Sequence, residues 1–138
     1  MDTSTEKFEI AIRPVPQDVD ELGHVNNVVY LRWVQDAAVA HWRSRTTPSE
    51  QAKIFWVVLR HEIDYKHPSF SGDRLIARTW VGIATDLEFE RFTEILREND
   101  NRLLARARTV WCPINAKTGK PLRVSPDIRG RFSVAASG

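Results

Sequence analysis

The sequence predicts an α+β fold in which one long helix packs against a curved antiparallel sheet. One segment carries apolar residues at helical spacing, and it lies between one strand-like segment and four more that follow in succession. The last three connections are short enough to be hairpins, which indicates antiparallel strands. A sheet of this kind must bury one face, and the single helix is the element available to cover it.

The first half of the chain contains one expected strand and the expected helix. Residues 7–12 (KFEIAI) alternate polar and apolar side chains, as a short strand does, and Pro14 and Pro16 then indicate a loop. From Asn27 onward the apolar residues spread over a wide arc, which is typical of a helix covered on most sides. They are Val28, Val29, Leu31, Trp33, Val34, Ala37, Ala38, Val39 and Trp42. We expect Pro48 and the polar segment around it to end this helix.

The second half of the chain reads as strands. We expect four of them, over residues 54–65, 74–84, 87–97 and 102–111. The first is rich in β-branched and aromatic residues. We place six of its residues on one face, namely Phe55, Val57, Leu59, His61, Ile63 and Tyr65. To bury so broad a helical arc, the sheet has to curl around the helix.

The composition indicates one globular domain over residues 1–138, with flexible tails at about 1–5 and 132–138. The hydrophobic fraction is 42%, and the formal charge of +2 falls well short of a nucleic-acid-binding surface. No segment reaches the roughly 18 apolar residues of a membrane span. Residues 1–7 lack the apolar segment of a signal peptide, and the single Cys112 forms no zinc-type pattern. We expect a cytoplasmic protein with no metal and no nucleic-acid or membrane partner.

The segment DVDELGHVNN, residues 18–27, is the strongest candidate for chemistry. If the helix begins at Asn26 or Asn27, its first backbone N–H groups lack intrahelical partners and lie at the positive end of the helix dipole. Such donors can stabilise a carbonyl oxygen that acquires negative charge. Gly23 permits a close turn, and the Asp20 carboxylate can act as a base or a nucleophile beside the same carbonyl. Together these groups are the minimum required for acyl transfer.

The same residues also have purely structural interpretations. Asp and Asn are ordinary capping residues before a helix, and such a loop usually has no other role. His24 alone would more often be a hydrogen-bonded structural histidine, and Tyr30 could simply belong to the core. His41, near the helix end, can interact favourably with the helix dipole without any function. The spacing of the whole segment decides between these interpretations.

The pattern DxDxxGHVNNxxY, followed directly by a long apolar helix, resembles the signature of the hotdog-fold acyl-CoA thioesterases of the 4-hydroxybenzoyl-CoA thioesterase-like group. Three later segments also match the layout of that family, namely IDYKHPSFSGDRL, ARARTVW and KTGKPLRVSP. The resemblance implies a hotdog fold, in which a five-stranded antiparallel sheet wraps around one long central helix. It also implies hydrolysis of an acyl-CoA thioester to a free carboxylic acid and CoA.

The resemblance further implies roles for individual residues. Asp20, the second acid of the DxD pair, would be the catalytic carboxylate, acting as nucleophile or as general base. The helix N-terminal N–H near Asn27 would polarise the thioester carbonyl, and Asp18 would serve the structure of the loop. The residues expected to bind substrate or shape the pocket are Gly23, His24, Asn26 and Tyr30.

Partners and alternatives follow from the same resemblance. No cofactor is implied, because coenzyme A is part of the substrate, and the family suggests a homodimer or homotetramer. An aromatic set could line an aryl or a fatty-acyl pocket: Trp33, Phe55, Trp56, Trp80 and Phe89. Basic residues that remain candidates for the CoA phosphates are Arg60, Lys66, Arg74 and Arg91. The alternatives are an acyl-carrier-protein thioesterase, a non-catalytic acyl-CoA-binding module, and a hydratase, whose DxNPxH pattern this chain lacks.

Overall fold

A computed structural model describes residues 6–133 of the chain. Its strands form one antiparallel sheet in the order β1-β3-β4-β5-β2. They are β1 (Phe8–Ile12), β2 (Ile54–Tyr65), β3 (Leu75–Ala84), β4 (Phe89–Arg97) and β5 (Leu103–Asn115). The helices are the long α1 (Asn27–Ser44) and the short η1 (Pro16–Asp18), α2 (Pro48–Lys53) and α3 (Pro126–Arg131). Residues 1–5 and 134–138, where flexible tails are expected, lie outside the described part.

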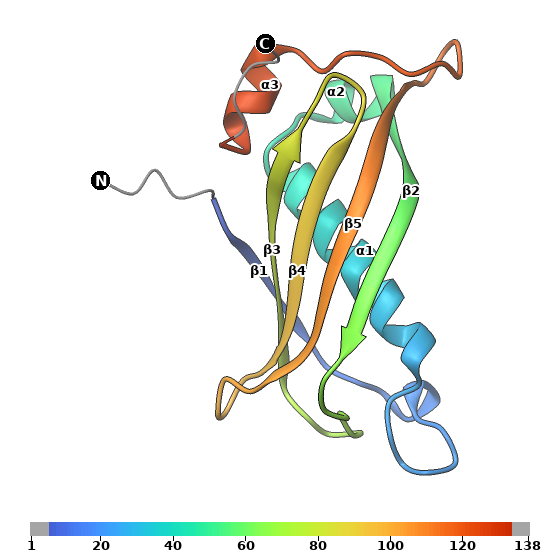
Figure 1. Cartoon of the computed structure of the whole chain (residues 1–138), viewed down its shortest axis with the longest axis vertical. Helices are drawn as coiled ribbons and strands as arrows, with labels where there is room; N and C mark the ends of the chain where they lie inside the picture. The colour runs from blue at the N-terminus through green and yellow to red at the C-terminus, as the bar shows by residue number, and fades with distance from the viewer. Residues whose placement is uncertain (1–5, 134–138) are drawn as a thin grey trace.

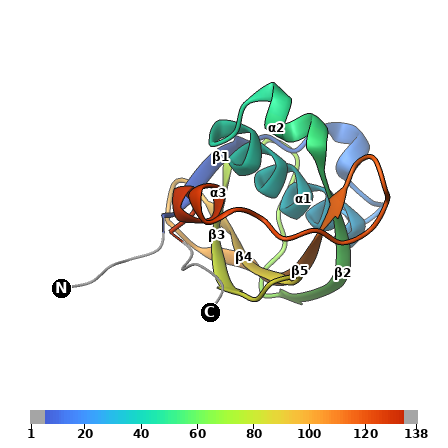
Figure 2. The ribbon, with the colours of Figure 1, turned by 90° about the horizontal axis from the view of Figure 1, so that it is seen from above.

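Helix α1 lies diagonally across one face of the sheet, and the sheet curves around it (Figures 1 and 2). It packs against β1, β3 and β4. The short helix α3 lies near the C-terminal end of α1, and the loop that precedes α1 lies at the opposite end (Figure 1). The predicted α+β arrangement of one long helix on a curved antiparallel sheet is therefore confirmed.

The core consists of two clusters, one for each half of α1. Around the N-terminal half, Trp33 and Ala37 pack with Leu75, Ile95 and Leu104, all of them at most 4% exposed. The second cluster contains Ile54, Val81, Phe89, Val124, Ile128 and Phe132. Phe132, the first residue of the expected C-terminal tail, is 5% exposed. The segment after β5 thus completes the core at the C-terminal end of α1.

A β-bulge divides strand β2 into two parts that present opposite side-chain faces. Val58 pairs with Trp111 and Arg60 pairs with Val110, so Leu59 is an extra residue in β2. Because successive side chains in a strand point to opposite faces, one inserted residue reverses the faces beyond it. The prediction that six alternate residues of β2 share one face is therefore wrong.

The consequences of the bulge appear in the side-chain contacts of β2. Before it, Trp56 faces the helix and contacts Trp42, while the outward-facing residues are exposed, namely Phe55 (57%), Val57 (43%) and Leu59 (54%). Beyond it, His61 and Tyr65 face the helix. The Tyr65 hydroxyl donates to the carbonyl oxygen of Asn27 at 3.1 Å. The bulge thereby brings the end of β2 to the start of α1.

Candidate active site at the start of the long helix

The loop before α1 is a tight hairpin fixed by its own backbone. The Asp20 N–H donates to the His24 carbonyl at 2.8 Å, and the Gly23 N–H donates to the Asp20 carbonyl at 3.0 Å. Val19 and Val25 form a bridge on either side of this turn. Gly23 has a φ of +82°, in the left-handed region where residues with a Cβ are strained. The predicted need for a glycine at this turn therefore has a clear backbone cause.

The Asp20 carboxylate lies on the exposed side of this hairpin. Its Oδ1 accepts hydrogen bonds from the backbone N–H groups of Leu22 at 2.9 Å and His24 at 3.2 Å. Among residues 6–133, no group donates to its other oxygen, Oδ2. One carboxylate oxygen is thus held by the turn, and the second is available to a substrate or a water molecule.

Asp18, two residues earlier, has the opposite environment. It is 5% exposed, its Oδ2 accepts from the Val15 N–H at 3.0 Å, and its Oδ1 accepts from Arg32 Nη2 at 3.0 Å. Burial alone would raise the pKa of Asp18, but the Val15 hydrogen bond and the Arg32 charge outweigh it and lower that pKa. The Asp18 carbonyl also accepts from the Asn26 N–H at 2.8 Å. Asp18 therefore anchors the loop to both of its ends.

Helix α1 begins at Asn27 with unsatisfied backbone donors. Asn26 is the N-cap residue, but its side chain makes no capping hydrogen bond. The Val29 N–H donates to the Asn26 carbonyl at 2.9 Å. In the described part of the chain the N–H groups of Asn27 and Val28 have no acceptor, and both residues are exposed. These two donors lie at the positive end of an 18-residue helix, and groups of this kind can hydrogen-bond an oxygen that carries negative charge.

The loop between β2 and β3 supports the hairpin from the side. The Val25 N–H donates to the Ser69 carbonyl at 2.8 Å, and the Tyr30 hydroxyl and Ser69 Oγ are 2.6 Å apart. His24 forms a bridge with Phe70, and their rings meet edge to face with centroids 5.1 Å apart. Both loops therefore hold the start of α1 in place.

In the structure the predicted site residues fall into an exposed group and a buried one. Those on the exposed hairpin and the helix start are Asp20, Gly23, Asn26 and Asn27, with His24 partly covered by Phe70. Tyr30 is 2% exposed, and its burial raises the pKa of the hydroxyl. Tyr30 is thus part of the framework beneath the hairpin. Sequence reasoning assigned no role to Ser69 or Tyr65, although both lie in the segment IDYKHPSFSGDRL that matches the family layout; Tyr65 ends β2, and Ser69 lies in the connection that follows it.

Two further observations concern ions and membranes. Among residues 6–133, no group of three or more His, Cys, Asp or Glu side chains is arranged to hold a metal ion. In the same part of the chain, no helix is both long enough and apolar enough to cross a membrane.

An antiparallel sheet wrapped around one long helix is the hotdog fold, and solved structures with this fold superpose well on the chain. A 1,4-dihydroxy-2-naphthoyl-CoA thioesterase from Synechocystis has 20% identity and a TM-score of 0.81, covering 93% of this chain and 96% of its own. A DHNA-CoA thioesterase from Staphylococcus aureus has 22% identity and a TM-score of 0.80, covering 92% and 89%. A thioesterase from Thermus thermophilus, solved with coenzyme A and Zn, has 24% identity and a TM-score of 0.78, covering 90% of each chain.

The family is established by the sequence itself. The family model of the Thioesterase-like superfamily matches residues 14–132, and the chain belongs to this superfamily. No curated protein matches the sequence significantly. The predictions of a hotdog fold and of a thioester hydrolase are confirmed.

Proposed function

We propose that the chain hydrolyses acyl-CoA thioesters to a carboxylic acid and CoA at the start of α1. The observation that carries this proposal is the Asp20 carboxylate, which has one oxygen fixed by the hairpin and the other without a partner among residues 6–133. The hairpin leads directly into the exposed N–H groups of Asn27 and Val28. Membership of the superfamily supports the reaction class. Similarity to a thioesterase solved with coenzyme A, and to another that acts on an aryl-CoA, supports the substrate class.

The helix start would act on the thioester carbonyl. Its oxygen would accept hydrogen bonds from the Asn27 and Val28 amides, and these bonds strengthen as the oxygen becomes negative in the tetrahedral intermediate. The helix dipole acts in the same direction. Because these donors are backbone groups at a helix start, they need no reorganisation when substrate arrives.

Asp20 would act in one of two ways. As a nucleophile, its oxygen attacks the carbonyl carbon, the C–S bond breaks, and the CoA thiolate leaves and takes a proton from solvent. Water then hydrolyses the resulting mixed anhydride. As a general base, Asp20 instead takes a proton from a water molecule whose oxygen attacks the carbonyl, and the C–S bond then breaks and the CoA thiolate leaves and takes a proton. Both routes release the same carboxylic acid and CoA, and neither requires a metal or redox cofactor.

The residues around Asp20 would shape the site. Gly23 permits the tight turn of the hairpin, so that substrate can approach its backbone closely. His24 and Asn26 would flank the thioester. Tyr30 would be a positioning residue, because its hydroxyl binds Ser69 beneath the hairpin.

We also propose that the chain is a homo-oligomer in which a second copy covers β2. This strand is at one end of the sheet, so its outer edge has no strand partner among residues 6–133. Its outward residues before the bulge are apolar and exposed, as described above. A second β2 placed antiparallel to the first would pair the edge and bring these apolar side chains beside those of the second copy.

The test compares the wild type with Asp20→Asn in the release of thiol from short-chain, long-chain and aryl acyl-CoA substrates. Asparagine retains the oxygen that accepts from Leu22 and His24, so the hairpin is preserved. We expect kcat/KM to fall by about 10²–10⁴. Glu21→Gln, an exposed carboxylate change in the same hairpin, is the matched control and should retain activity.

The outcomes separate the alternatives. Turnover that survives Asp20→Asn would refute the role of Asp20. Absence of turnover on every acyl-CoA, with turnover on an acyl carrier protein, would favour the carrier-protein thioesterase. Binding of acyl-CoA without turnover of either substrate class would favour the non-catalytic module. Single-turnover hydrolysis in H₂¹⁸O then separates the two mechanisms, because only the nucleophilic route can leave ¹⁸O in the Asp20 side chain.

A further inference from the structure

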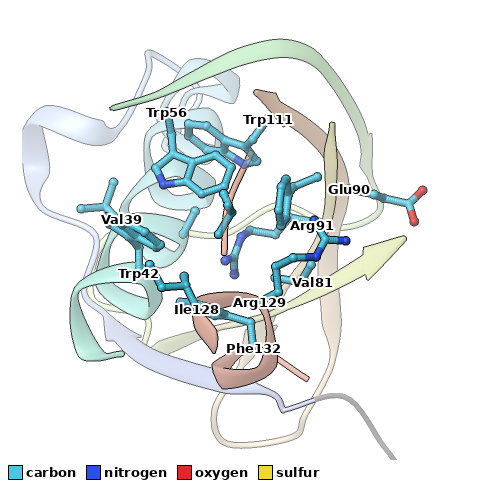
Figure 3. A pocket seen from close by; sticks show the side chains of 13 residues that line it. Val39, Trp42, Trp56, Val81, Glu90, Arg91, Trp111, Ile128, Arg129 and Phe132 are labelled. Carbon is cyan, nitrogen blue, oxygen red and sulfur yellow. The ribbon is translucent and has the colours of Figure 1, made fainter. Parts of the chain in front are cut away.

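An apolar cavity lies at the opposite end of α1 from the hairpin. It is lined by residues of the C-terminal half of α1, the sheet and α3 (Figure 3), is partly open, and has a volume of about 70 Å³. One water molecule requires only about 10–15 Å³ measured in this way. Its walls include Trp42, Trp56, Val81, Phe89, Trp111 and Phe132. At 1.5 Å per residue along the helix, Ala38 and Trp42 are roughly 17 and 22 Å from Asn27.

Two buried arginines, Arg91 and Arg129, line this largely apolar cavity, and Arg129 donates to the carbonyls of Ala84 and Thr85 at 3.0 Å. Arg91 comes from β4 and is 7% exposed, and Figure 3 shows its side chain among the aromatic residues. Its Nη1 donates to His41 Nδ1 at 3.0 Å and to Thr79 Oγ1 at 3.1 Å. Within residues 6–133, its Nε and Nη2 atoms donate to no acceptor. Two nitrogens of the guanidinium thus remain available to a ligand.

No carboxylate of the described chain pairs directly with Arg91. The acid connected to it is Glu6, which is reached through His41 at 3.1 Å and is also paired with Arg45. Glu90 lines the cavity, but its carboxylate accepts from Arg108 and from the Ile83 N–H, and it points away from the cavity (Figure 3).

A buried charge without a direct partner is costly in an apolar site, and an anion placed there would compensate it. Two residues of the cavity wall also carry unpaired donors. The indole Nε1 atoms of Trp56 and Trp111 are buried, and neither has an acceptor in the described part of the chain. Buried donors normally find a partner, so the cavity wall is short of hydrogen-bond acceptors. A carboxylate is both an anion and a multiple acceptor, and it matches the guanidinium fork.

We propose that this cavity binds a free carboxylate with an apolar body, whose carboxylate pairs with Arg91 and whose body packs against the aromatic walls. An acyl thioester of a simple fatty acid has no free carboxylate, so the site distinguishes a free acid from its thioester. The inference rests on the cavity and its charge and is independent of the proposed role of Asp20.

The test uses octanoate and 1-octanol, which share an apolar chain but differ in charge. Binding to the full-length protein is followed by tryptophan fluorescence, because Trp42, Trp56 and Trp111 line the cavity. We expect octanoate to bind with a Kd at least about tenfold lower than that of 1-octanol, because charge-assisted pairs are the stronger ones. Arg91→Gln should abolish this difference. Arg106→Gln, a change of an exposed arginine on the neighbouring strand, should leave it intact.

Two controls keep the proposal falsifiable. If Arg91→Gln does not fold, Val39→Trp fills the rim of the cavity from a position that is 40% exposed, and it should weaken octanoate binding at least about fivefold. Asp20→Asn should leave octanoate binding unchanged. Equal affinity for the two ligands, no binding of octanoate, or loss of its binding in Asp20→Asn would each overturn the proposal.

Discussion

The two aspartates of the DxD pair should respond to mutation in opposite ways, although they are two residues apart. Asp18→Ala removes the acceptor for the Val15 N–H and the partner of Arg32. Loss of the acceptor for this partly buried backbone donor costs about 1–2 kcal/mol. The Arg32 side chain is 55% exposed, so its ion pair adds only about 0–1 kcal/mol. We expect the free energy of unfolding to fall by about 1–3 kcal/mol.

Asp20→Ala should have the complementary effect. Its carboxylate accepts two backbone hydrogen bonds on an exposed hairpin, so its removal should cost at most about 1 kcal/mol of stability. Its effect on thioester hydrolysis should be far larger than that of Asp18→Ala. Urea unfolding with linear extrapolation measures the first quantity, and thiol release measures the second.

The pH dependence gives a further check on Asp18. Its pKa in the folded protein lies below the ordinary value of 3.8, so its stabilising contribution is complete above that value. The contribution is lost as the pH falls through the lowered pKa. The difference in unfolding free energy between wild type and Asp18→Ala should therefore be constant near neutral pH and shrink under acid conditions. Equal stability at pH 7, or a difference that grows as the pH falls, would refute this account.

Two more predictions follow from contacts already described. Tyr30→Phe should lower the free energy of unfolding by about 1–2 kcal/mol, because it leaves the fully buried Ser69 hydroxyl without its partner. Urea unfolding measures this, and an unchanged value would show that the Ser69 hydroxyl finds another partner. Leu59→Glu places a charge on the exposed outer face of β2, so it should convert the proposed oligomer to monomer. Light scattering coupled to size exclusion measures the mass, and a wild type that is already monomeric would contradict the proposed assembly.

The regular elements of the fold could be predicted because their signals are local. The wide apolar arc from Asn27 gave the start of α1, and the β-branched run gave β2 with both of its ends. The faces of β2 could not be predicted in this way. The Leu59 bulge depends on pairing with β5, and an alternation rule applied to one strand cannot show an inserted residue.

The short helices α2 and α3 were missed although their caps are present in the sequence. Thr47 and Glu50 form a capping box around Pro48, and Ser125 caps α3 just before Pro126. From the sequence we interpret Pro48 only as the end of the long helix, whereas α1 ends at Ser44 and Pro48 is the first residue of α2. Both helices have six residues, too few to show a helical period.

The residues of the candidate site could be predicted from the sequence, but their different roles could not. The sequence could place Asp18 and Asp20 in one loop, but only the structure shows one of them buried and the other exposed. His41 shows the same limit. It lies in the last turn of α1, as expected, but it is also 0% exposed and bonds to Glu6 and Arg91. These partners are 35 and 50 residues away in the chain, beyond the range of any local pattern.

The hydrogen bond from His41 to Glu6 has a practical consequence for anyone who shortens the protein. Glu6 precedes β1, where a designer would readily trim the chain, yet it is the acceptor for a histidine with no exposure to solvent. A truncation that begins at Lys7 would leave the buried Nε2–H of His41 without its acceptor and Arg45 without its ion-pair partner. An affinity tag is therefore better added in front of Met1 than used to replace the first residues.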